Sequence, residues 1–190
     1  MLRIQPCSRA VSAVLLATVL TGCATMTPEE CQVANWYLIG EMDAREGRSP
    51  SYFADRARAC NEAGHPADQE SWYEGWEHGL SWFCTSIPGY RYGREGKRYE
   101  PICPVSLEPE FLRAYDLGRQ THAQEAAVSG FVRQLEVVER SLRDGNKNDS
   151  LSEEEVAVLR RRQQALRREL REAELQLAEL IGVARGRGLQ

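Results

Sequence analysis

The 190-residue sequence contains no long apolar run and lacks the motifs that identify several common enzyme classes. Its most apolar stretch, residues 10–20, is much shorter than the ~20 residues that a helix needs to cross a bilayer. No G-x-S-x-G, H-E-x-x-H or phosphate-loop pattern occurs, so hydrolases and phosphotransferases of those types are not expected. We therefore predict that the protein is not an enzyme and has no catalytic residue and no cofactor; a hydrolase with paired carboxylates is the least favoured alternative.

The chain has no excess of positive charge, and histidine is scarce. The chain carries 24 basic and 28 acidic residues, a net charge of −4, which argues against a nucleic-acid partner. Of its three histidines, His65, His78 and His122, His78 lies one helical turn after Glu74, with which it could share a metal ion. No third ligand is evident, and no C-x₂-C spacing occurs among the cysteines. We therefore predict no metal site.

The N-terminus has the features of an export signal. Arg3 and Arg9 precede the apolar stretch, and small residues follow it. Residues 20–23, Leu-Thr-Gly-Cys, resemble the bacterial lipobox, whose cysteine receives diacylglycerol and, after cleavage, a further acyl chain such as palmitate on its amine. The resemblance implies that residues 1–22 are a lipoprotein signal peptide, that Cys23 is lipidated, and that residues 23–26 form a membrane tether. Ala24 favours the outer membrane, facing the periplasm; the alternative is a secreted protein cleaved near Ala24.

Four cysteines remain beyond the lipobox: Cys31, Cys60, Cys84 and Cys103. An even number in an oxidising compartment predicts two disulfide bonds, for which three pairings exist. The expected helix positions favour Cys31–Cys60, between two antiparallel neighbours, and Cys84–Cys103, which would close a loop. A four-cysteine metal site is the competing interpretation.

Local signals predict four helices in the first part of the chain. Thr27, Pro28 and Glu30 form a helix start with a capping box, and this helix should run to about Arg45. A second helix is expected from Ser49-Pro50 to Gly64, and a third from Asp68 or Ser71 to about Cys84. Residues 85–105 hold three glycines and three prolines, which predicts a structured loop with a short hairpin at residues 93–96. A fourth helix should begin at residues 106–110.

Aromatic residues and glycines gather between residues 72 and 99. Gly75 and Gly79 share one helical face, which indicates that another backbone passes closely there. An aromatic-then-glycine pattern recurs near Gly40, Gly75 and Gly118, but its irregular spacing indicates helix contacts and no repeat protein. The Trp-rich helix 72–83 and the Tyr/Arg loop 90–99 form a candidate site for a glycan or an anionic envelope polymer. Its ligand-binding residues would be Trp72, Trp76, Tyr90, Tyr92, Arg94 and Tyr99; the alternative is core packing beside a solvated loop.

Residues 31–118 resemble a family of small proteobacterial lipoproteins of unknown function. The resemblance is carried by "NWYLIGEMDAREGR", "YEGWEHGLSWFC", "GYRYGREGKRYEPICP" and "FLRAYDLGR", with Ala44 standing where glycine is expected. It implies an exported, lipidated, disulfide-bonded domain followed by a helical tail. It implies no activity.

The C-terminal part has the heptad pattern of a helical hairpin. A turn is expected at residues 144–151, after which Ser152 and Glu155 form a capping box. The same segment resembles a calcium-binding EF-hand loop in part, but Asp149 occupies the position where that loop needs glycine. The predicted apolar seam consists of Val128, Phe131, Leu135, Val138 and Leu142 on the first arm, and Val156, Leu159, Gln163, Leu166, Leu170, Ala173, Leu177 and Leu180 on the second.

Together these patterns predict a mainly α fold: a disulfide-bonded helical domain over residues 27–118, with a Gly/Tyr-rich loop, and a coiled-coil-like hairpin over residues 119–190. We expect a lipid-anchored structural or adaptor protein of the Gram-negative envelope. Its expected partners are the membrane, through the N-terminal lipid, and a protein or a second copy, through the hairpin.

Overall fold

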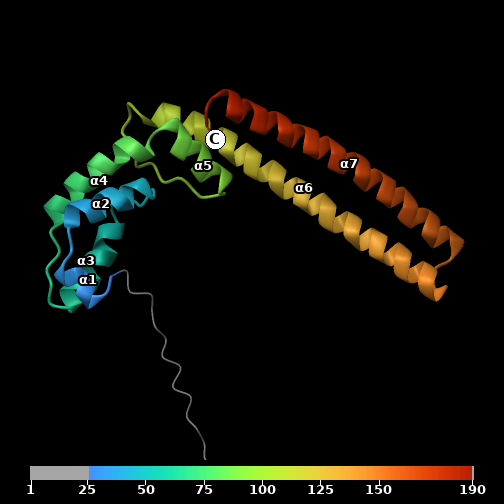
Figure 1. Ribbon diagram of the computed structural model, residues 1–190, viewed down its shortest axis with the longest axis horizontal. Coiled ribbons are helices and arrows are strands. Elements are labelled where there is room, and N and C mark those ends of the chain that lie inside the picture. The colour runs from blue at the N-terminus through green and yellow to red at the C-terminus, as the bar shows by residue number, and fades with distance from the viewer. Residues whose placement is uncertain (1–25, 190) are drawn as a thin grey trace, which may run out of the picture.

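The computed structural model describes residues 26–189, which form seven α-helices and no β-strand (Figure 1). The predicted mainly helical fold, with two disulfide bonds and a long C-terminal helical region, is confirmed. The predicted signal peptide and Cys23 lie outside the described residues. None of the helices between residues 26 and 189 is both long and apolar enough to cross a bilayer. The helices are α1 (Pro28–Gln32), α2 (Trp36–Arg45), α3 (Tyr52–Glu62), α4 (Gln69–Phe83), α5 (Ser86–Arg94), α6 (Glu108–Asn148) and α7 (Glu153–Gly186).

The single helix expected over residues 27–45 is divided into α1 and α2. The predicted capping box starts α1, since Thr27 Oγ1 accepts from the Glu30 amide and Glu30 Oε2 accepts from the Thr27 amide. The division arises at Asn35, whose side chain accepts from the amide of Leu38 and so caps a new helix. The break leaves α1 free to turn toward α3, to which the Cys31–Cys60 disulfide joins it.

The loop predicted at residues 85–105 is wrong in its first half, which forms α5. Pro88 is tolerated because it lies in the first helical turn, where amides have no intrahelical acceptor. Gly89 and Gly93 serve close helix packing and do not form turns. The non-helical stretch is residues 95–107, which the Cys84–Cys103 disulfide ties to the end of α4. The hairpin predicted at residues 93–96 is wrong, because these residues end α5 and form the turn after it. Both disulfides are the pairs that the expected helix positions favour.

Glycines bring α2 and α4 into direct backbone contact. A methyl group on Gly40 would lie 2.0 Å from the carbonyl oxygen of Trp72, and one on Gly75 would lie 1.9 Å from that of Tyr37. Residues later in α2 contact residues later in α4, so the two helices run parallel. No side chain larger than hydrogen fits at either position without moving a backbone.

The same arrangement recurs in α5 and α6. A methyl group on Gly93 would lie 2.2 Å from the carbonyl oxygen of Tyr115, and one on Gly118 would lie 2.1 Å from that of Tyr90. This second pair is also parallel, and it is the main contact that α5 makes. Aromatic-x₂-glycine is therefore the common spacing at both crossings, with Tyr37, Trp72, Tyr90 and Tyr115 as the aromatic members.

Aligned on the ends of α2 and α5, the two helix pairs correspond in their contacts, Gly40 with Gly89 and Gly79 with Gly118, which corrects the expectation of no repeat. The triplet Arg-Glu-Gly ends α2 at residues 45–47 and ends α5 at residues 94–96. Both final glycines have positive φ, 76° at Gly47 and 71° at Gly96, and each faces a ring of the partner helix. A methyl group would lie 2.6 Å from the Phe83 ring at Gly47 and 2.8 Å from the His122 ring at Gly96. We call α1 to α5 with the first turns of α6 the body of the protein. We conclude that the body contains two copies of one helix-pair unit, α2 with α4 and α5 with α6.

Ala44 occupies, in the first unit, the place that Gly93 occupies in the second. Its side chain is completely buried, and its Cβ faces Gly79 on α4. The departure from the expected glycine is accommodated because the glycine needed at this contact is supplied by α4.

Helices α6 and α7 form a long arm that projects from the body (Figure 1). Helix α6 runs without a break across residue 118, so the predicted domain boundary falls inside a helix. Asp149, with φ of 50°, turns the chain, and the predicted Ser152–Glu155 capping box starts α7. Because residues 144–148 are helical, they do not have the open conformation of a calcium-binding loop.

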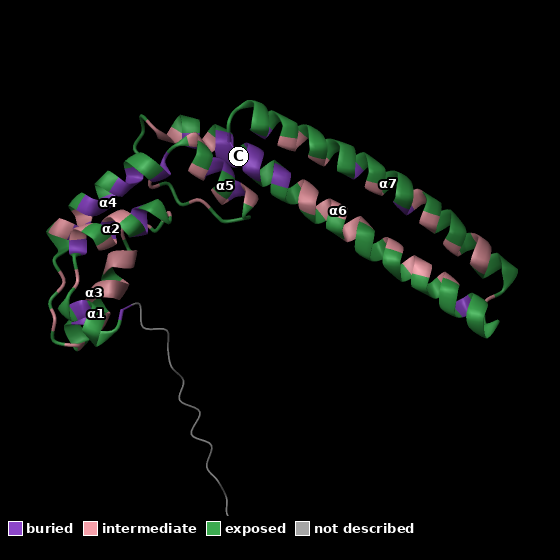
Figure 2. Ribbon diagram, viewed as in Figure 1, coloured by how far each residue is buried: buried purple, intermediate pink, exposed green. Residues whose placement is uncertain are grey.

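The two ends of the arm differ in burial. Figure 2 shows buried residues concentrated in the body and few of them along the arm. At the body, the end of α7 closes over α5 and α6, where Ala184 and Leu189 pack with Tyr90, Ala114 and Leu117. The arm is therefore anchored to the body through both of its helices.

Candidate functional site

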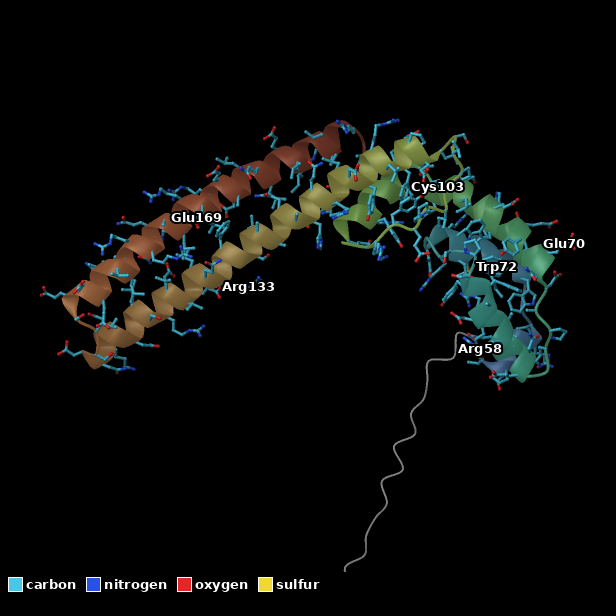
Figure 3. All side chains as sticks on the ribbon, turned by 180° about the vertical axis from the view of Figure 1, so that it is seen from behind. Arg58, Glu70, Trp72, Cys103, Arg133 and Glu169 are labelled. Atoms are coloured by element: carbon cyan, nitrogen blue, oxygen red, sulfur yellow. A yellow bond between two sulfur atoms is a disulfide. The ribbon has the colours of Figure 1, made fainter. Side chains whose placement is uncertain are left out.

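The two tryptophans proposed as ligand-binding residues belong to the core. Trp72 is completely buried, and its indole nitrogen donates a 3.0 Å hydrogen bond to Oδ2 of Asp43. Trp76 is also buried and donates to the backbone oxygen of Arg48 at 2.9 Å. Figure 3 shows Trp72 among the side chains of the body. Neither ring presents a face on which a sugar could stack.

Tyr90 and Tyr99 are likewise engaged in packing. Tyr90 is 2% exposed beneath the end of α7, and within residues 26–189 its hydroxyl has no hydrogen-bond partner. The Tyr99 hydroxyl donates to Glu108 at 3.0 Å and accepts from the Cys103 amide at 3.1 Å. Partial burial raises the pKa of Tyr99, which keeps this hydroxyl a donor.

Arg94 is committed to an ion pair with Glu125 of α6. Two guanidinium nitrogens of Arg94 contact Oε1 of Glu125, at 2.7 and 3.0 Å. This hydrogen bonding raises the pKa of Arg94 above its ordinary value. Of the six predicted ligand-binding side chains, only Tyr92 lines the groove described next, so the six do not form one binding platform.

A basic groove lies where the ends of the two helix-pair units meet. It has a volume of about 600 Å³, and Phe83, Pro88 and Tyr92 contribute its apolar and aromatic lining. We call it the basic groove after its cationic residues, Arg45, Arg48, Arg91, Lys97 and Arg98. Arg45 and Arg48 were missed at the sequence level, although the repeated Arg-Glu-Gly-basic pattern at residues 45–48 and 94–97 was a usable signal.

A buried charge cluster lies elsewhere, between α2, α3 and α4. Asp43 is 1% exposed and accepts from Arg56 Nη2 at 2.6 Å and Nε at 2.7 Å, as well as from Trp72. Each partner is satisfied by this geometry, and the cluster joins three helices. We assign it a structural role.

No group of three metal-ligating side chains occurs within the described part of the chain. His78, paired with Glu74 in the sequence analysis, has Glu41 of α2 as its charged neighbour at 3.7 Å. Its ring also stacks near Tyr37, with centroids 6.1 Å apart.

The arm contains the second feature with functional potential. Its seam is covered incompletely: Leu166 and Ala173 are buried, whereas the other predicted seam residues remain partly exposed. Gln163 donates to Glu139 at 3.0 Å, and Arg167 contacts the same carboxylate at 2.8 Å. The polar residue on the seam is therefore satisfied within the hairpin, where it sets the register of α6 against α7.

The body of the protein is similar to a known protein family. Residues 35–120 match the family described as "Protein of unknown function (DUF2799)". This span contains both helix-pair units up to the first turns of the arm, so the body of the protein is similar to that family. No curated protein matches the chain, and no solved structure matches it.

Proposed function

We propose that this protein is an outer-membrane lipoprotein facing the periplasm, and that it acts as a structural or adaptor protein through its helical arm. The observation that carries the adaptor role is the arm itself. Beyond the body it extends for roughly 40 Å, at 1.5 Å of rise per helical residue. It offers a long, partly apolar surface.

The occupant we propose for this surface is the arm of a second copy. A two-helix hairpin covers each seam residue from one side, so apolar area remains available on the flanks. Pairing of two hairpins into a four-helix bundle would cover it, at about 25 cal/mol for each Å² of apolar area removed from water. Mixed charge on the exposed faces, such as Arg133 on α6 and Glu169 on α7 (Figure 3), suits a solvated bundle exterior.

The membrane attachment is supported by the start of the folded body. Met26 is buried, and its sulfur lies 3.8 Å from Sγ of Cys60. Met26 is the third residue after Cys23, and an extended chain spans at most ~3.6 Å per residue, or roughly 11 Å over these three steps. A lipid on Cys23 would therefore hold the body directly against the membrane surface.

Mass spectrometry of the processed chain tests the anchor. We expect a polypeptide that begins at Cys23 and carries diacylglyceryl and acyl groups, and we expect Cys23→Ser to release the protein from the membrane fraction. An unmodified Cys23 in the processed chain would overturn the lipoprotein proposal and leave the arm proposal standing.

Sedimentation equilibrium tests self-association of the arm. On the α6 helical wheel Val132 falls beside the seam, whereas Val137 falls on the far side; both are exposed. We expect a concentration-dependent dimer that Val132→Glu weakens and Val137→Glu, its matched control, leaves unchanged. A monomer at every concentration, or an equal effect of the two variants, would contradict pairing through the seam.

A further inference from the structure

The basic groove is built from equivalent parts of the two helix-pair units. The end of α2 contributes Arg45 and Arg48, and α5 with the turn after it contributes Arg91, Lys97 and Arg98. Arg48 and Lys97 are equivalent positions, and both line the groove together with the equivalent carboxylates Glu46 and Glu95. The positive charge of the groove therefore comes from both units.

Three of these five cations have an acidic neighbour. Arg45 pairs with Glu41 at 2.5 Å, Arg48 with Glu46 at 3.5 Å, and Lys97 with Glu95 at 2.7 Å. Arg91 and Arg98 form no ion pair with any residue between 26 and 189. The groove thus retains a positive surplus on a chain whose net charge is −4.

Aromatic rings support three of the cations without neutralising them. The Arg48 guanidinium lies 4.5 Å from the centroid of the Tyr52 ring, and Lys97 Nζ lies 5.2 Å from that of Tyr92. The Arg45 guanidinium lies 4.9 Å from the centroid of a Trp82 ring. The backbone of Arg48 is held by the hydrogen bond from Trp76. The pKa of Tyr92 is raised, mainly by burial, so its hydroxyl stays protonated and can donate to an anion.

We propose that the basic groove binds a phosphate-bearing ligand, with Arg91 and Arg98 as the main anion-binding residues and Tyr92 as a neutral donor. Guanidinium groups bind phosphate through paired, charge-assisted hydrogen bonds, and two unpaired arginines match the charge of a phosphate monoester. The volume of about 600 Å³ accommodates the phosphate together with the group that carries it. The same phosphate chemistry occurs in a lipid headgroup and in a soluble phosphorylated metabolite.

Isothermal titration calorimetry with inorganic pyrophosphate tests the groove. The chain would be produced from residue 23 onward, without the signal peptide and with Cys23→Ser, so that an acyl anchor contributes nothing. We expect saturable binding with one site per chain, weakened at least about tenfold in the R91Q/R98Q double variant. The control variant R160Q/R161Q removes two exposed arginines of α7, and with them the same net charge, and should bind as the parent does.

A second experiment, with lipid vesicles, identifies the source of the phosphate. Cosedimentation with phosphatidylcholine vesicles that contain phosphatidylglycerol, lost in R91Q/R98Q and retained in R160Q/R161Q, supports a lipid headgroup. Pyrophosphate binding without vesicle binding supports a soluble phosphorylated ligand. Absence of binding in both experiments, or equal losses of binding in the two double variants, would overturn the proposal. Such a failure leaves the sedimentation behaviour of the arm untouched, so the two proposals are separable.

Discussion

Asp43 shows how one side chain can connect three helices. It lies on α2, accepts two hydrogen bonds from Arg56 of α3 and accepts a third from Trp72 of α4. A carboxylate that is 1% exposed is tolerable only because these donors replace its water. The aromatic core and the ion pair therefore depend on each other.

We predict that Asp43→Ala destabilises the protein by about 3 kcal/mol, because it leaves the Arg56 charge and the Trp72 indole without their acceptor. Urea unfolding at neutral pH with the disulfides intact measures this. Glu95→Ala removes an exposed pair with Lys97 and should cost about 0–1 kcal/mol. Equal effects of the two substitutions would contradict the structural role of Asp43.

Glu139 connects the two helices of the arm, since this α6 carboxylate accepts hydrogen bonds from Gln163 and Arg167 of α7. The hydrogen bond from Arg167, and to a smaller extent the one from Gln163, holds the pKa of the Glu139 carboxyl below its ordinary value. The stabilisation is therefore present above the ordinary pKa of a glutamate, about 4.3, and is lost as pH falls through the lowered folded-state pKa.

We predict that Glu139→Gln lowers the melting temperature of the arm at neutral pH, and that the difference from the parent shrinks as pH falls below about 4. Thermal unfolding followed by circular dichroism at a series of pH values measures this difference. Comparing variant and parent at the same pH removes the effect of other carboxylates. A gap that stays constant with pH would show that the charge of Glu139 does not set the register.

At the scale of elements, glycine decides how the helices pack. Gly75 lies against a backbone carbonyl of α2, whereas Gly130, in the middle of α6, has no atom near the place of a Cβ. The same residue type is therefore required at one helix position and costly at the other.

We predict opposite effects of two identical substitutions. Gly75→Ala should destabilise the protein by about 2 kcal/mol or more, because it pushes α2 away from α4. Gly130→Ala should stabilise it by up to about 1 kcal/mol, through helix propensity alone. Chemical unfolding of both variants tests this, and a stabilising Gly75→Ala would refute the close crossing.

For the whole molecule, the important contact is the one that returns the end of the arm to the body. Ala184 is completely buried beside Tyr90 and Leu117, so the arm is fixed at its base through both helices. An arm held in this way keeps a defined direction relative to the body, which suits it to bridge partners.

We predict that Ala184→Glu frees the last turns of α7 while the helix pairs stay folded, because a carboxylate does not fit this apolar contact. Amide hydrogen exchange should become faster over residues 180–189 and remain unchanged over α2 and α4. Ala178→Glu, at an exposed position of the same helix, is the control. Global loss of protection in Ala184→Glu would show that the arm and body fold as one unit.

The sequence predicted most reliably those features that depend on neighbouring residues. Thr27 with Glu30, Asp68, and Ser152 with Glu155 were identified as helix starts because a capping side chain bonds amides within three residues of itself. The heptad pattern of the arm is local for the same reason. Residues 86–94 were assigned to a loop because glycine and proline oppose helix formation locally, whereas Gly93 lies in a helix because the backbone of α6 needs the space.

The sequence by itself therefore determined the helical class, the cysteine pairs that were favoured and the two-arm hairpin, all of which follow from periodicity, capping and spacing along the chain. Only the tertiary structure decided that α5 is a helix, that the body consists of two equivalent glycine-packed pairs, and that their basic ends form one groove. Those features depend on residues such as Arg45 and Arg98, which are far apart in sequence and meet only after the helices have packed.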